Sequence, residues 1–119
     1  MKTFNITAAQ GEISIRRISK VPGGDLAPLS LEGGRYVIGH SETGHHHILS
    51  RTDGVEVMVL DKPPAGMRIL YAILESPTSL DHLREFDTHE SIMLEPGMYE
   101  FRIAREFDPY AEMARLAAD

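Results

Sequence analysis

Apolar and polar residues alternate with a period of two along most of the chain, which is the pattern of β-strands. The clearest case is the segment MYEFRIARE, in which Tyr99, Phe101 and Ile103 are separated by Glu100 and Arg102. Such a strand has one face toward a core and the other toward water. Shorter runs of the same kind occur at residues 4–6, 13–15 and 36–38.

Two further segments, residues 55–60 and 69–74, are apolar on alternate positions and largely apolar between them. In the second, Ile69, Tyr71 and Ile73 alternate with other apolar side chains, so both faces of the strand are apolar. This pattern is typical of a strand that is covered on both sides. It also predicts more apolar surface than one thin domain hides, and we therefore expect a homo-oligomer.

Turn-forming pairs separate the apolar runs at the short intervals of a sandwich or barrel. Asp53-Gly54 predicts a hairpin turn, Pro96-Gly97 predicts a type II turn, and residues 20–33 predict a long surface loop. We expect one all-β domain over residues 1–119, a compact barrel or sandwich of roughly 8–10 strands.

One helix is predicted, at residues 109–118. Asp108 is a suitable N-cap, Pro109 suits the first helical position, and Tyr110, Met113 and Leu116 form an apolar stripe. The stripe predicts packing against the β-domain or against a neighbouring subunit.

Composition narrows the range of functions. The chain has 119 residues and a net charge of −6, from 12 basic and 18 acidic side chains, so it should repel nucleic acid. It has no cysteine, which excludes disulfides, thiolate catalysis and Cys-ligated zinc. We see neither a signal-like start nor an apolar run of about 20 residues, and we expect a cytoplasmic protein with no membrane partner.

The candidate chemistry lies in the segment GHSETGHHHIL, residues 39–49, which holds four of the six histidines. If a strand begins at His45, then His45 and His47 share one face and can converge on one divalent cation. His89 is the best candidate for a third ligand and His82 the second, while Glu42 and Glu90 are the nearest carboxylates.

Ligands of this kind, without sulfur, admit zinc, nickel, iron or manganese. An ion with an open coordination position would hold water and could be catalytic, whereas an ion on a symmetry axis would be structural. His46 should face away from the ion, and the spacing of His40 matches no partner. The competing interpretation is a polar loop, or an interface patch that becomes charged below about pH 6.5.

The spacing Gly39, five residues, His45, one residue, His47 resembles the first half of the first cupin motif. That resemblance implies a small β-barrel with a metal ion inside. In cupins a glutamate follows, where this chain has Arg51 and Thr52, and the last histidine comes after a Pro-Gly turn, whereas His89 precedes it. The chain also resembles small uncharacterised bacterial and phage proteins with a Gly-His-x-His segment, a likeness that names no role.

Two hypotheses follow from these patterns. The first is a metal-binding, cupin-like protein of unknown substrate, in which a water-bearing ion acts on a small polar ligand. The second is a non-enzymatic structural or accessory module of a phage or prophage particle, which works through oligomeric interfaces. The sequence leaves open whether the protein is an enzyme.

Overall fold

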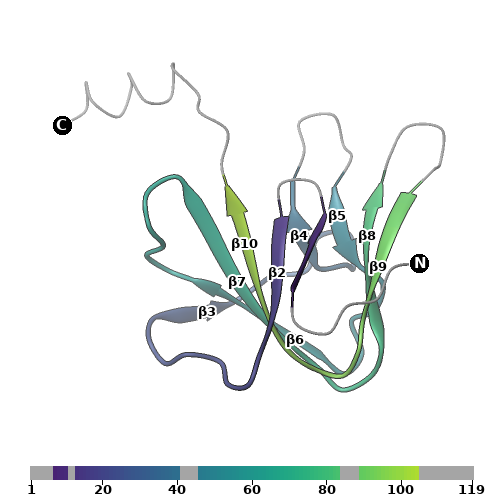
Figure 1. Ribbon diagram of the computed structural model, residues 1–119, viewed down its shortest axis with the longest axis horizontal. Coiled ribbons are helices and arrows are strands. Elements are labelled where there is room, and N and C mark those ends of the chain that lie inside the picture. Colours follow the sequence, from purple (N-terminus) through teal and green to yellow (C-terminus); the bar gives the residue numbers. More distant parts are fainter. Residues whose placement is uncertain (1–6, 11–12, 41–45, 84–88, 105–119) are drawn as a thin grey trace, which may run out of the picture.

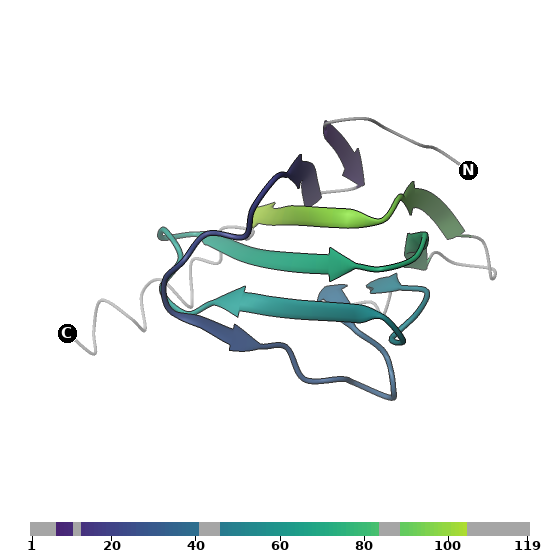
Figure 2. The same ribbon diagram turned by 90° about the horizontal axis from the view of Figure 1, so that it is seen from below.

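The strands form two antiparallel sheets in a computed structural model that describes residues 7–10, 13–40, 46–83 and 89–104 (Figures 1 and 2). The six-stranded sheet has the order β1 (Thr7–Gln10), β2 (Ile13–Ile18), β10 (Gly97–Ala104), β7 (Met67–Leu74), β6 (Val55–Leu60) and β3 (Leu26–Pro28). The four-stranded sheet has the order β4 (Val37–Gly39), β5 (His47–Leu49), β8 (Thr78–Leu83) and β9 (His89–Leu94).

The predicted all-β class is confirmed. Among the described residues, no strand pairing joins the two sheets into a closed barrel, so the arrangement is sandwich-like. The described residues also contain no helix long and apolar enough to cross a membrane. The helix predicted at residues 109–118 lies outside them.

The core lies between the sheets and is built from the alternating positions of their strands. Phe101, fully buried in β10, is paired with Ile15 of β2 and with Leu70 of β7, so one row of large side chains crosses three strands. Burial of side chains of this size stabilises the fold by about 1.5–3 kcal/mol each. The buried cluster also includes Ile13, Ile38, Leu49, Val57, Ala72, Leu74, Leu80, Ile92, Leu94, Tyr99 and Ile103.

A two-stranded ribbon passes from one sheet into the other. The β7–β10 ladder ends at the pair Leu74 and Gly97, and the β8–β9 ladder begins at the pair Thr78 and Leu94. Only a few residues separate β7 from β8, and β9 from β10, so the ribbon continues from one sheet into the other. Figure 1 shows the bend at the bottom of the molecule. Such corners are where strands switch sheets, and this one brings the two inner faces together.

Polar contacts hold the corner at its Pro96-Gly97 bend. The Arg17 guanidinium donates to Pro96 O at 2.6 Å, and the Tyr99 hydroxyl donates to Glu95 O at 2.6 Å. Gly97 has a φ of 150°, and a Cβ at this position would lie 2.9 Å from Arg17 Nη2. The positive φ is the reason for glycine here, since the Arg17 guanidinium is the end of a flexible side chain that can move.

The structure corrects two of the predicted connections. The turn at Asp53-Gly54 exists, and Val55 N–H donates to Thr52 O at 3.3 Å, but the turn joins β5 to β6 in different sheets. It is not a hairpin, because the partner of a strand is decided by distant segments. The predicted loop at residues 20–33 contains β3, which pairs with β6 at the sheet edge, where a proline such as Pro28 is tolerated.

We expect Tyr99→Phe to lower the free energy of unfolding by about 1 kcal/mol, because it removes the hydroxyl that bonds the corner and leaves the ring in place. Urea denaturation followed by circular dichroism measures the change. Tyr36→Phe is the matched control, because no hydrogen bond of its hydroxyl occurs among the described residues, and its unfolding should shift by less than about 0.5 kcal/mol. Equal effects of the two variants would contradict the role given to Tyr99.

Candidate functional site

One register row crosses the whole four-stranded sheet at the end that lies away from the corner. Gly39 of β4 pairs with His47 of β5, His47 pairs with His82 of β8, and His82 pairs with Glu90 of β9. Residues paired directly across an antiparallel sheet have their Cβ atoms on the same face. His47 also lies two positions from Leu49 of the core, so this row continues the inner face of the sheet.

His47 is buried, with 1% of its surface exposed, and its position is fixed from the other sheet. Gln10 of β1 reaches across the interior, and its amide nitrogen donates to Leu80 O at 2.9 Å. The amide oxygen of Gln10 is therefore the acceptor for His47 Nδ1, at 2.8 Å. His47 Nδ1 carries the hydrogen, and in the neutral imidazole Nε2 carries the lone pair.

This arrangement is the one that metal-binding histidines use. A ligating imidazole commonly donates its second N–H to a carbonyl or carboxylate, which selects the tautomer and sets the ring orientation. In this structure Gln10 accepts the bond from His47 Nδ1 and so orients its ring. No local pattern indicates this contact, because Gln10 is 37 positions from His47.

The His82 ring stacks on the His47 ring, with centroids 3.9 Å apart and planes inclined by 16°. A ring nitrogen presents its lone pair in the plane of its ring, and an ion lies about 2.0–2.1 Å from it. Because the two ring planes are nearly parallel, the in-plane lone pairs of His47 and His82 cannot point at the same ion. In this arrangement His82 supports the His47 ring by contact, and it would have to rotate to share an ion with it.

Gly39 provides the space for the His47 ring. A Cβ on Gly39 would lie 3.3 Å from His47 Cδ2 and 3.0 Å from Cδ1 of Ile13, which is itself fully buried. Both contacts are tighter than ordinary packing allows. The glycine of the motif therefore has a direct structural reason, which is the close approach of an imidazole to the backbone of the neighbouring strand.

His40 and His46 form a second, more exposed group. Their rings meet edge to face at a centroid distance of 5.3 Å, and His40 Nε2 lies 2.6 Å from a carboxylate oxygen of Glu32. Both partners of that hydrogen bond are about half exposed. A solvated pair of this kind contributes little to stability.

The remaining predicted ligands are only partly placed. His45 and Glu42 lie outside the described residues. The backbone of His89 pairs with Leu83, one position beyond the row that contains His47, and its side chain is not among those described. Within the described residues, no three histidine or carboxylate side chains are grouped as a ready metal site.

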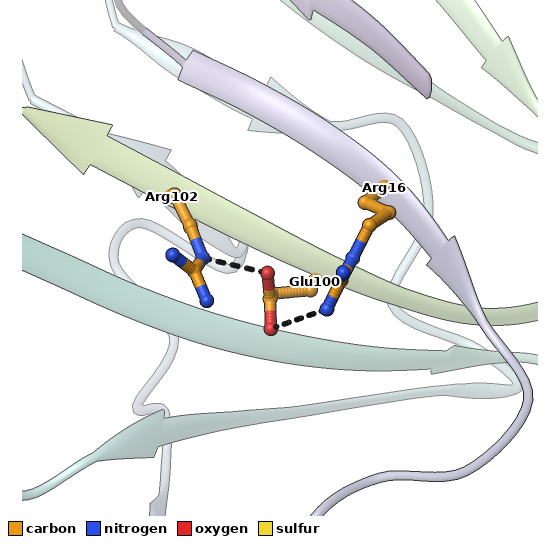
Figure 3. Close-up of polar contacts among 3 residues, drawn as sticks. All are labelled: Arg16, Glu100 and Arg102. Atoms are coloured by element: carbon orange, nitrogen blue, oxygen red, sulfur yellow. Dashed lines mark hydrogen bonds and ion pairs between the residues drawn. The ribbon is translucent and has the colours of Figure 1, made fainter. Parts of the chain in front are cut away.

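A separate polar cluster lies on the outer face of the six-stranded sheet. The sequence pattern predicts Glu100 on the solvent-exposed face of its strand, but only 4% of the residue is exposed. The Arg102 guanidinium donates to Glu100 Oε1 at 2.7 Å, and Arg16 approaches Oε2 at 3.4 Å (Figure 3). Tyr71 of β7 pairs with Glu100 from the other side.

The described fold defines an all-β domain of two antiparallel sheets, with a histidine held between them. A family model described as a domain of unknown function (DUF8820) matches residues 9–104, and the chain belongs to that family. A search of curated proteins and a search of solved structures each found no match.

We expect Gly39→Ala to destabilise the protein by about 1–3 kcal/mol, because the added methyl group overpacks the space between Ile13 and His47. Gly23→Ala is the control, since a Cβ there would meet nothing within 4 Å, and its unfolding free energy should be unchanged or slightly higher. Chemical denaturation measures both. An unchanged stability for Gly39→Ala would show that the His47 ring is not held against this strand.

Stability should also fall at alkaline pH. Burial raises the pKa of Tyr71 above its usual value of 10.0, and the nearby charge of Glu100 raises it further. Burial likewise raises the pKa of Tyr99. Above about pH 10 the unfolded chain releases protons that the native state keeps, so the free energy of unfolding decreases as pH rises toward the pKa of the folded state.

Denaturant titrations between about pH 8 and pH 11 measure this decrease. Tyr71→Phe should show a shallower decrease than the parent protein, because one of the two linked protons is gone. A parallel pH profile for Tyr71→Phe and the parent would contradict the assignment.

Proposed function

We propose that this protein binds a divalent metal ion at the end of the four-stranded sheet that lies away from the corner, with Nε2 of His47 as a ligand. The observation that carries the proposal is the Gln10–His47 hydrogen bond. It assigns the hydrogen to Nδ1 and the lone pair to Nε2, as in metal-binding histidines. Because the acceptor is buried, the tautomer is selected by the fold and not by solvent.

The surrounding chemistry supports this proposal. Gly39 leaves room for the His47 ring beside the backbone of β4. The ligand set expected from the sequence adds His45 and His89 to His47, and the backbone register places His89 one position off the row that contains His47. The chain has no cysteine to draw the ion into a thiolate site.

A cupin-like role follows as the second step of the proposal. In cupins the ion lies inside the β-structure, and His47 is on the inner face between the two sheets. An ion held there by three protein ligands keeps a position for water and could act as a Lewis acid on a small polar ligand. The residues of this chain would orient the ligand imidazole and exclude bulk water from it.

The proposal is tested by metal-dependent stability. A metal that binds only the native state raises the free energy of unfolding by about 2.7 kcal/mol at a hundredfold excess over its dissociation constant. Chelator should therefore lower the melting temperature, and zinc or nickel should restore it. The restoration should weaken as pH drops through about 6.5, because protonated imidazole does not ligate.

His47→Ala should abolish the response to metal, and His46→Ala should keep most of it. Gln10→Ala should weaken metal affinity about 10- to 100-fold, because it removes the group that orients His47. An equal loss of the metal response in His46→Ala and His47→Ala would indicate that the histidines form a polar loop and not a metal site. A metal response that survives in His47→Ala would place the ion elsewhere.

A further inference from the structure

The outer face of the six-stranded sheet carries a hollow of about 430 Å³ at the strands β1, β2 and β10. Its polar lining comes from alternate positions that the register brings together. Thr7 pairs with Arg16, Arg16 pairs with Glu100, and Ser14 pairs with Arg102. Five polar side chains of three adjacent strands therefore share one face around the hollow.

The centre of this group is a buried carboxylate between two guanidinium groups. The side chain of Glu100 is 6% exposed, whereas those of Arg16 and Arg102 are 55% and 50% exposed. Figure 3 shows both guanidinium groups reaching the same carboxylate, each from its own strand. Two positive charges and one negative charge leave a local excess of one positive charge.

Neutralisation of Glu100 alone does not require both arginines. The short bond from Arg102 Nε, at 2.7 Å, already supplies a charge-assisted partner, whereas Arg16 Nη2 lies at 3.4 Å. A guanidinium has five N–H donors, and among the described residues each of these two groups bonds only Glu100. Both side chains line the hollow, and their other donors bond no described residue.

We propose that this hollow binds the oxyanion of a small ligand, a carboxylate or a phosphate group, between Arg16 and Arg102. The planar guanidinium fork matches both oxyanions, and the hydroxyl groups of Thr7 and Ser14 are further donors on the same face. Glu100 holds the two guanidinium groups in place through its hydrogen bond from Arg102 and its ion pair with Arg16. The volume lies within the range of about 300–1,000 Å³ that is typical of small-ligand sites.

The excess positive charge stands out because the chain as a whole carries a net charge of −6. A small anion is recognised by local donors at short range, whereas a long polyanion would meet the repulsion of the remaining acidic surface. The site is separate from His47, which faces the interior between the sheets.

The test is a titration of the full chain with sodium phosphate and, in a second arm, with sodium succinate, at constant ionic strength maintained with sodium chloride. Calorimetry and amide chemical shifts of Ser14, Arg16, Glu100 and Arg102 are the readouts. We expect saturable binding in at least one arm, and the tighter arm identifies the oxyanion. Absence of saturation in both arms would overturn the proposal.

Arg16→Gln and Arg102→Gln should each weaken binding by about tenfold or more, because each removes one charged fork. Arg35→Gln, which makes the same change of net charge at an exposed position outside the hollow, should stay within about twofold of the parent. An equal loss of anion affinity in Arg35→Gln would show that net charge alone accounts for binding, and it would contradict the proposed site.

Two further variants keep the outcome interpretable. Arg16→Lys retains the charge and loses the fork, so it should bind several-fold more weakly, and full affinity would contradict recognition by the fork. His40→Ala, a change at a half-exposed histidine next to β4 of the other sheet, should bind the anion as the parent does, which separates this site from the histidine cluster. Circular dichroism of each variant at the titration temperature verifies that the two-sheet fold is retained.

Discussion

The bend that carries the β7–β10 ribbon into the β8–β9 ribbon is the constraint on which the other features depend. Because the same two stretches of chain belong to both sheets, the sheets must face one another across the corner. The core then forms from their inner faces, and Gln10 of β1 comes within reach of β5 and β8. Arg17, Tyr99 and Gly97 matter because they hold this corner.

The two candidate sites lie on opposite faces, an inner and an outer one, because successive side chains of a strand point to opposite faces of its sheet. His47 lies on an inner face, where burial and the Gln10 amide select one tautomer and limit access to the ring. Arg16 and Arg102 lie on an outer face, where their charges stay about half solvated while the carboxylate between them is buried. The inner site suits a cation that needs a lone pair, and the outer site suits an anion that needs donors.

Tyr71 shows how the outer face is more than a solvated surface. It alternates with core residues of β7, yet it is itself only 5% exposed, beside the buried Glu100. A strand with apolar residues on both faces was expected from residues 69–74, and the structure adds that a charged cluster lies within the second apolar face. Burial at this position raises the pKa of Tyr71, and the charge of Glu100 raises it further.

The sequence by itself determined the all-β class, the strand at Tyr99, Phe101 and Ile103, and the gathering of histidines near β5, because period two and turn chemistry are local properties. It did not determine that Asp53-Gly54 joins different sheets, that β3 forms within residues 20–33, that Glu100 is buried, or that Gln10 bonds His47. Each of these depends on which distant strand lies alongside. Strand pairing is a property of the whole chain, and only the tertiary structure decides it.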